Sequence, residues 1–141
     1  MEKKQLSDNL KQIDDRLNGV IENVNYAKVR HKSTAVITCC GNASYSLKDI
    51  QKKLTEIANS LAEEEKQLSE GISKNAGKIS GVIEDVEYAK VHYKSTAVIT
   101  SCGNAAKELK EIKKDLAEIE ASLGVSKDQS ESESESEPMG L

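Results

Sequence analysis

The chain has 141 residues, which is enough for one compact domain or two very small ones but not for a large core. It contains no Trp and no Phe, and 31% of its residues are charged, a composition typical of helices with one apolar stripe and one solvated face. The net charge of −4 arises entirely from residues 126–141, so the remaining chain is neutral and does not favour nucleic acid as a partner.

Neither a membrane span nor a cleaved signal peptide is predicted. The longest apolar run, Ala35-Val36-Ile37, is far shorter than the roughly 20 residues that cross a bilayer. The lysines near the N-terminus are not followed by the apolar segment that a signal peptide needs. We therefore expect a cytoplasmic protein, with export by a route that needs no such peptide left open.

An internal repeat organises the chain. The segment that begins Gly-Val-Ile-Glu at Gly19 returns at Gly81, an offset of 62 residues, and about two-thirds of the positions aligned up to Leu61 and Leu123 are identical. Such repetition is typical of a duplicated supersecondary unit whose copies pack together. We predict a first helical hairpin over residues 1–70, a second over residues 71–125, and a disordered acidic Ser/Glu tail over residues 126–141.

Apolar residues within each unit recur every three or four positions, which predicts amphipathic helices. The pattern covers residues 10–27 and 43–61 in the first unit and residues 79–89 and 106–123 in the second. Residues 29–38 and 91–100 are rich in β-branched side chains, which favour strands. We prefer helix there, because Val29, Ser33, Val36 and Cys40 continue the helical spacing, and strand is the alternative.

Turns are predicted where Gly precedes Asn, at Gly41-Asn42 and at Gly103-Asn104, because Gly commonly ends a helix and Asn commonly starts one. A third turn, from Gly71 to Gly77, would separate the units. The predicted fold is therefore all-α: tandem-duplicated antiparallel helical hairpins that form a four-helix bundle or a coiled-coil rod. The alternative is one long helix per unit that runs straight through Gly41.

The closest approach to a catalytic set is a thiol with a histidine, Cys39 or Cys40 with His31 in the first unit and Cys102 with His92 in the second. The spacing differs between the units, which a duplicated catalytic pair should not show. The cysteines also lack metal-binding spacing. We therefore predict no enzyme and no catalytic, cofactor or metal site; a thiol-based redox sensor is one alternative.

Two sets of residues are predicted to bind protein, either another copy of the chain or a helical partner. The first is a seam of small and β-branched residues, which would let helices of two chains approach closely: Thr34, Val36, Cys40, Thr96, Val98 and Cys102. The second is a pair of basic clusters that could dock an acidic partner or the acidic tail: Lys28, Arg30, Lys32, Lys90 and Lys94. We call this second set the basic patch.

The segments from Cys102 to Ile112 and from Cys40 to Ile50 place Gly, Asn and Ala before a helical pattern. In this order they resemble the residues after the turn of WXG100 (ESAT-6-like) helical hairpins, with the family's tryptophan position falling at Ser101 and Cys39. The resemblance implies a hairpin fold and a role as a type VII secretion chaperone or targeting partner of a helical toxin domain. From the residues themselves we expect a non-enzymatic interaction module that self-associates through its apolar seams.

Overall fold

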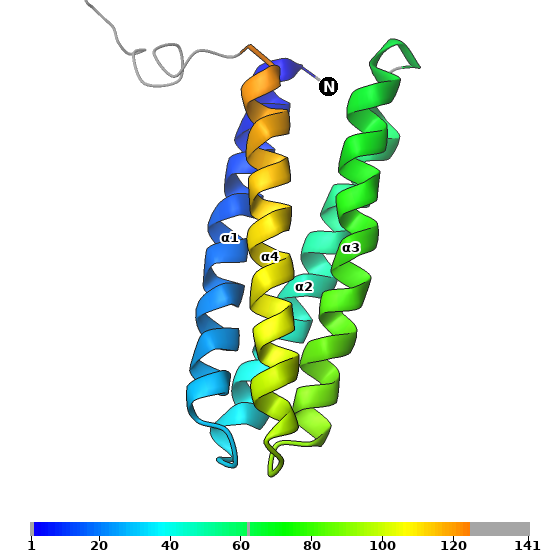
Figure 1. Cartoon of the computed structure of the whole chain (residues 1–141). Helices are drawn as coiled ribbons and strands as arrows, with labels where there is room; N and C mark the ends of the chain where they lie inside the picture. The colour runs from blue at the N-terminus through cyan, green and yellow to red at the C-terminus, as the bar shows by residue number, and fades with distance from the viewer. Residues whose placement is uncertain (1, 62, 125–141) are drawn as a thin grey trace, which may run out of the picture.

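A computed structural model describes residues 2–61 and 63–124, and these residues form four long helices that pack side by side (Figure 1). The helices are α1 (Lys3–Val29), α2 (Ala35–Ser60), α3 (Lys66–Val91) and α4 (Ala97–Ser122), with the 3₁₀ helix η1 (Glu63–Glu65) between α2 and α3. Each helix packs against two neighbours, in the order α1, α2, α3, α4 and back to α1. The predicted all-α, four-helix arrangement is confirmed, and residues 29–38 and 91–100 contain no strand.

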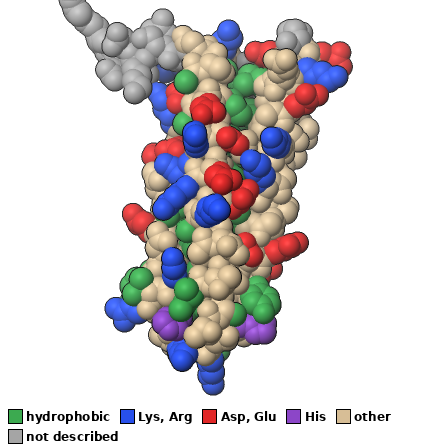
Figure 2. All heavy atoms as spheres, in the orientation of Figure 1, with side chains coloured by type: hydrophobic (Ala, Val, Ile, Leu, Met, Phe, Trp, Pro, Cys, Tyr) green, Lys and Arg blue, Asp and Glu red, His purple; other side chains and the backbone are tan. Residues whose placement is uncertain are grey.

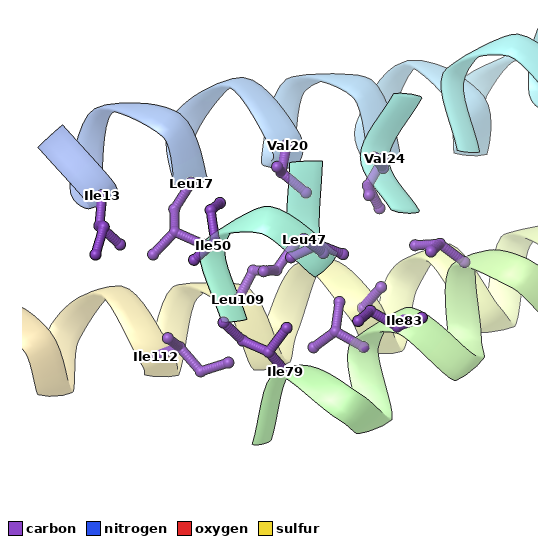
Figure 3. Packing of buried hydrophobic residues seen from close by; sticks show 14 of the residues in the cluster. Ile13, Leu17, Val20, Val24, Leu47, Ile50, Ile79, Ile83, Leu109 and Ile112 are labelled. Carbon is purple, nitrogen blue, oxygen red and sulfur yellow. The ribbon is translucent and has the colours of Figure 1, made fainter. Parts of the chain in front are cut away.

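The core is a continuous column of aliphatic side chains along the bundle axis, and all four helices contribute their apolar faces to it (Figure 3). On α1 the buried positions recur at intervals of four and three, as the sequence pattern predicts, and α2 and α4 repeat that spacing. The middle layers are built from fully buried Leu and Ile, of which these are examples: Leu17, Leu47, Ile50, Ile79, Leu109 and Ile112.

The predicted turns at Gly41-Asn42 and Gly103-Asn104 are wrong, because both pairs lie inside helices, α2 and α4. The chain instead reverses over residues 30–34 and 92–96. The alternative, one long helix per unit, is correct in that a helix runs straight through Gly41, but wrong in that each unit contains two helices and not one. The buried positions Val36, Cys40 and Ala43 continue through Gly41 without a break. Burial of these side chains outweighs the cost of a helical glycine, about 1 kcal/mol relative to alanine.

Both actual reversals contain the repeated Lys-Ser-Thr-Ala sequence and share a serine hydrogen bond, but among the described residues other than glycine only Lys32 has a positive φ. Lys32 adopts a left-handed conformation with φ of 74°, which bends the chain sharply. The hydroxyl oxygen of Ser33 then accepts a hydrogen bond from the backbone N–H of Ala35 at 3.1 Å, and Ser95 does the same for Ala97 at 3.0 Å. These serines satisfy N–H groups at the starts of α2 and α4, a role that Ser commonly fills.

The predicted boundary between the units also needs correction. Helix α2 ends at Ser60 and α3 begins at Lys66, so the boundary at residues 70 and 71, and the turn predicted from Gly71 to Gly77, fall within α3. No helix among the described residues is long and apolar enough to cross a membrane. The tail predicted to be disordered, residues 126–141, lies outside the described residues.

Candidate docking surface at the turn end

The two interhelical turns, residues 30–34 and 92–96, lie side by side at one end of the bundle (Figure 1). The backbone N–H of Lys32 donates a hydrogen bond to the carbonyl oxygen of Tyr93 at 2.9 Å and joins the two turns directly. We call these turns, with the adjoining ends of the four helices, the turn end. It brings together both halves of the basic patch, which are 62 residues apart in the sequence.

The turn end carries cations without neighbouring acids in the sequence. All five residues of the basic patch are exposed. The chain has no Asp or Glu from residue 23 to residue 48, nor from residue 88 to residue 107. In the face seen in Figure 2, Lys, Arg and His side chains surround the lower tip, and the red carboxylates lie higher on the bundle. The surface is therefore suited to an anionic ligand.

The same two acid-free segments expose apolar side chains. Val29 and Val91 are each 74% exposed, and Tyr26 and Tyr88 are 46% and 51% exposed. Every exposed large hydrophobic side chain among the described residues lies in these segments; the remaining two are Tyr45 and Ile99. Exposed apolar side chains that lie beside several positively charged ones are typical of an interaction site.

Aromatic rings help to order the charged side chains of the turn end. The guanidinium carbon of Arg30 lies 5.0 Å from the centre of the Tyr26 ring. In the second hairpin, the ring centres of Tyr88 and His92 are 4.2 Å apart. Such contacts restrict the side-chain rotamers before a ligand binds and so reduce the conformational entropy that is lost on binding.

Four of the six residues predicted to form a self-association seam lie inside the bundle. Val36, Cys40, Val98 and Cys102 are fully buried by other parts of the same chain. Only Thr34 and Thr96 are exposed, within the turns. A second copy could reach the four buried residues only by opening the bundle, so the structure does not present this seam as a surface.

The cysteine thiols lie in the core behind the turn end. Cys40 and Cys102 are fully buried on α2 and α4, and Cys39 is half-buried. The hydrogen bond between Cys40 and Cys102, together with burial, raises the pKa of the Cys40 thiol far above its ordinary value, whereas the same hydrogen bond lowers the pKa of the Cys102 thiol; burial raises the pKa of Cys39. A higher thiol pKa leaves less of the nucleophilic thiolate at neutral pH. Among the described residues, no group of three His, Cys, Asp or Glu side chains could hold a metal ion.

Carboxylates flank the turn end on α3. Glu87 forms an ion pair with Lys48 at 3.0 Å and accepts a hydrogen bond from the hydroxyl of Ser44 at 2.8 Å. The hydrogen bond from Lys48, and to a smaller extent the one from Ser44, lowers the pKa of the Glu87 carboxyl. These contacts engage Glu87 with α2, although Lys90 of the basic patch also contributes to the lowered pKa of this carboxyl.

The sequence did not predict four of the exposed residues of this surface: Val29, Val91, Tyr26 and Tyr88. The apolar spacing instead predicted that Val29 continues the apolar seam. A clue was present in the spacing. After Val24 and Ala27 the next seam position would be residue 31, so Val29 falls out of phase. The phase marks where the helix stops contributing to the core.

Comparison of the chain with protein-family models, curated proteins and solved structures finds no match. The resemblance to WXG100 hairpins therefore stays a prediction.

Proposed function

We propose that this protein is a non-enzymatic binding module, built from two duplicated helical hairpins, that docks a protein segment carrying both acidic and apolar side chains on its turn end. One observation carries the proposal: all exposed large hydrophobic side chains of the described residues fall in two acid-free segments that the fold joins at one end. A basic surface with apolar groups favours a ligand that combines the complementary charges with side chains to cover Val29 and Val91.

The bundle supports this role by satisfying its own apolar seams. The core positions of α1 to α4 are covered by one another, so association need not proceed through them. At the turn end, by contrast, a ligand can bury side chains that are already exposed, and the fold does not have to change. Full burial of one valine contributes roughly 1.5–3 kcal/mol, and its two equivalent copies would supply the apolar share of binding.

The environment of the thiols supports a binding role over catalysis. The contact between Cys40 and Cys102 raises the pKa of the Cys40 thiol and lowers that of the Cys102 thiol, but both side chains are fully buried in the core, where they are closed to a substrate. The ring of His92 packs on Tyr88. Neither arrangement supplies a base held beside a thiol by a third group, as thiol catalysis requires.

The test is a titration of the isotope-labelled full chain with a synthetic peptide of alternating Glu and Leu, followed by amide chemical shifts. We expect the largest shifts at residues 26–34 and 88–96. The double variant Lys32→Glu/Lys94→Glu should lose most of this binding. The matched control Lys52→Glu/Lys74→Glu reverses two exposed lysines far along the shafts of α2 and α3 and should keep it. Equal loss in both variants, or shifts spread over the shafts, would contradict the proposed site.

A further inference from the structure

We infer that the ligand of the turn end is the Ser/Glu tail, residues 126–141, of a second copy of this chain, so that copies associate turn end to tail. This inference rests on the proposed docking function of the turn end and names the partner that the surface fits. It would make self-association a property of the turn end and the tail and not of the buried helix seams.

Charge complementarity within the chain is the first argument. Residues 126–141 contain Lys127, Asp128 and four Glu, which sum to the whole net charge of −4. The rest of the chain is neutral, yet its turn end gathers five exposed cations in acid-free segments. A tail with excess negative charge and a surface formed by two acid-free segments therefore belong to the same molecule. Opposite charges of this kind steer association and select the partner.

The tail also matches the apolar part of the surface. Glutamate and serine alternate from Glu131 to Glu137, and the residues that follow include the apolar Met139 and Leu141. An acidic run followed by apolar side chains is what a surface with both cations and uncovered valines requires. A simple polyanion would satisfy the cations of the turn end but leave Val29 and Val91 in water.

The direction of α4 favours a second copy over the same chain. This helix begins beside the turn end and finishes at Ser122, at the opposite end of the bundle (Figure 1). Its 26 residues span about 39 Å at 1.5 Å per residue. The seven steps from Gly124 to Glu131 reach at most about 25 Å, and only the last residues of a fully extended tail could span the whole bundle, so the acidic run as a whole cannot lie on its own turn end. A neighbouring copy has no such limit.

The experiment measures native mass by light scattering behind size exclusion, over a protein dilution series at low ionic strength and under reducing conditions. Two full-length variants remove the two sides of the contact: Glu131→Gln/Glu133→Gln/Glu135→Gln/Glu137→Gln, called the neutral-tail variant, and Lys32→Glu/Lys94→Glu. The matched controls change the same numbers of exposed charges elsewhere: Glu56→Gln/Glu70→Gln/Glu111→Gln/Glu118→Gln, and Lys52→Glu/Lys74→Glu.

We expect the unaltered chain to exceed monomer mass in a concentration-dependent way, and added salt to dissociate it because the charges involved are exposed. The neutral-tail and Lys32→Glu/Lys94→Glu variants should each raise the dissociation constant by about tenfold or more. Both controls should associate like the unaltered chain. A tail with the four glutamates changed to lysine should regain binding to the Lys32→Glu/Lys94→Glu protein, which a loss of folding could not produce.

Several outcomes would overturn the inference without removing the docking function. One is a monomer at every concentration in a protein that still binds the Glu-Leu peptide at the turn end. Another is a monomer whose turn-end amide shifts change when its own tail is neutralised, which would indicate docking within one chain. A third is binding of the unaltered and neutral-tail proteins to phosphatidylserine vesicles with equal affinity and no association of copies, which would assign the surface to an anionic bilayer.

Discussion

The two helical hairpins, α1 with α2 and α3 with α4, share most of their core but differ in the polar contacts that they make. Leu47 and Leu109 occupy the same repeat position and are both fully buried. On the surface between α2 and α3, the side-chain amide of Gln51 donates to the carbonyl oxygen of Ala76 at 2.8 Å, whereas the equivalent positions on α4 and α1 hold an ion pair, Lys113 with Asp14, at 3.2 Å.

This difference teaches that the apolar seam determines the packing and that the polar contacts adapt to it. Both hairpins reverse at equivalent positions, with α1 and α3 ending at Val29 and Val91. The amide contact and the ion pair bridge equivalent helix interfaces, so the same helix arrangement is compatible with either contact. Exposed ion pairs contribute little to stability, commonly 0–1 kcal/mol. Changes at equivalent core positions of the two hairpins should therefore alter the free energy of unfolding by similar amounts. Changes at the few core positions where the two repeats hold different residues should alter it by different amounts.

The largest effect is expected at the matched leucines. Leu47→Ala and Leu109→Ala should each lower the free energy of unfolding by about 2–5 kcal/mol, because each leaves a cavity in a fully packed layer. Urea denaturation followed by helical circular dichroism measures both. Similar costs would sharpen the equivalence of the hairpins, whereas a cost near zero at one leucine would break it.

The next effect concerns a buried amide that only the second hairpin contains. Asn75 occupies the repeat position of Ile13, and its side-chain oxygen is buried without a hydrogen-bond partner, although its amide nitrogen donates to the carbonyl of Gly71 at 2.9 Å. Asn75→Ile should raise the free energy of unfolding by about 1–3 kcal/mol, since it removes an unsatisfied buried polar group. Ile13→Asn should lower it. Destabilisation by Asn75→Ile would instead assign Asn75 a role in helix register.

A smaller effect separates a helical glycine from a turn glycine. Gly41 and Gly103 lie within helices, and a Cβ atom added at either would meet only a lysine Nζ at 3.8 Å, an ordinary contact. Gly41→Ala and Gly103→Ala should each raise the free energy of unfolding by about 0.5–1 kcal/mol. The control Gly124→Ala should not stabilise, because Gly124 has φ of +74°. Destabilisation by the first two changes would restore the predicted turns.

The smallest effect is the pH dependence contributed by the Arg16–Asp49 pair of the first hairpin. Arg16 hydrogen-bonds the Asp49 carboxylate and thereby holds the pKa of that carboxyl below its usual value. A pKa that is lower in the folded state stabilises the protein above the unfolded value, about 3.9, and this contribution is lost as the pH falls through the folded pKa. Asp49→Asn should lower the Tm slightly at about pH 6 and leave it unchanged at about pH 2. An equal loss at both values would contradict an electrostatic role.

Much of the fold and part of the candidate site could be predicted from the sequence. The three-and-four spacing indicated the helices and most of their buried faces, and the repeat predicted equivalent basic clusters at Lys28–Lys32 and Lys90–Lys94. The turns could not be placed, because glycine and asparagine at residues 41 and 42 favour a turn locally. The competing signal, a hydrogen bond from the backbone N–H of Ala35 to the Ser33 hydroxyl, is a weaker local pattern, and only the packed helices show which of the two signals the chain uses.

By itself, the sequence determined that the chain is helical, because side-chain periodicity along one segment is a local property. It also determined which segments lack acids and where the net charge resides. The tertiary structure decided that the chain reverses at residues 30–34, that Val36 and Cys40 are core and that Val29 is surface. The physical reason is that burial depends on contacts between helices distant in sequence, and those contacts can outweigh the roughly 1 kcal/mol preference of a single glycine.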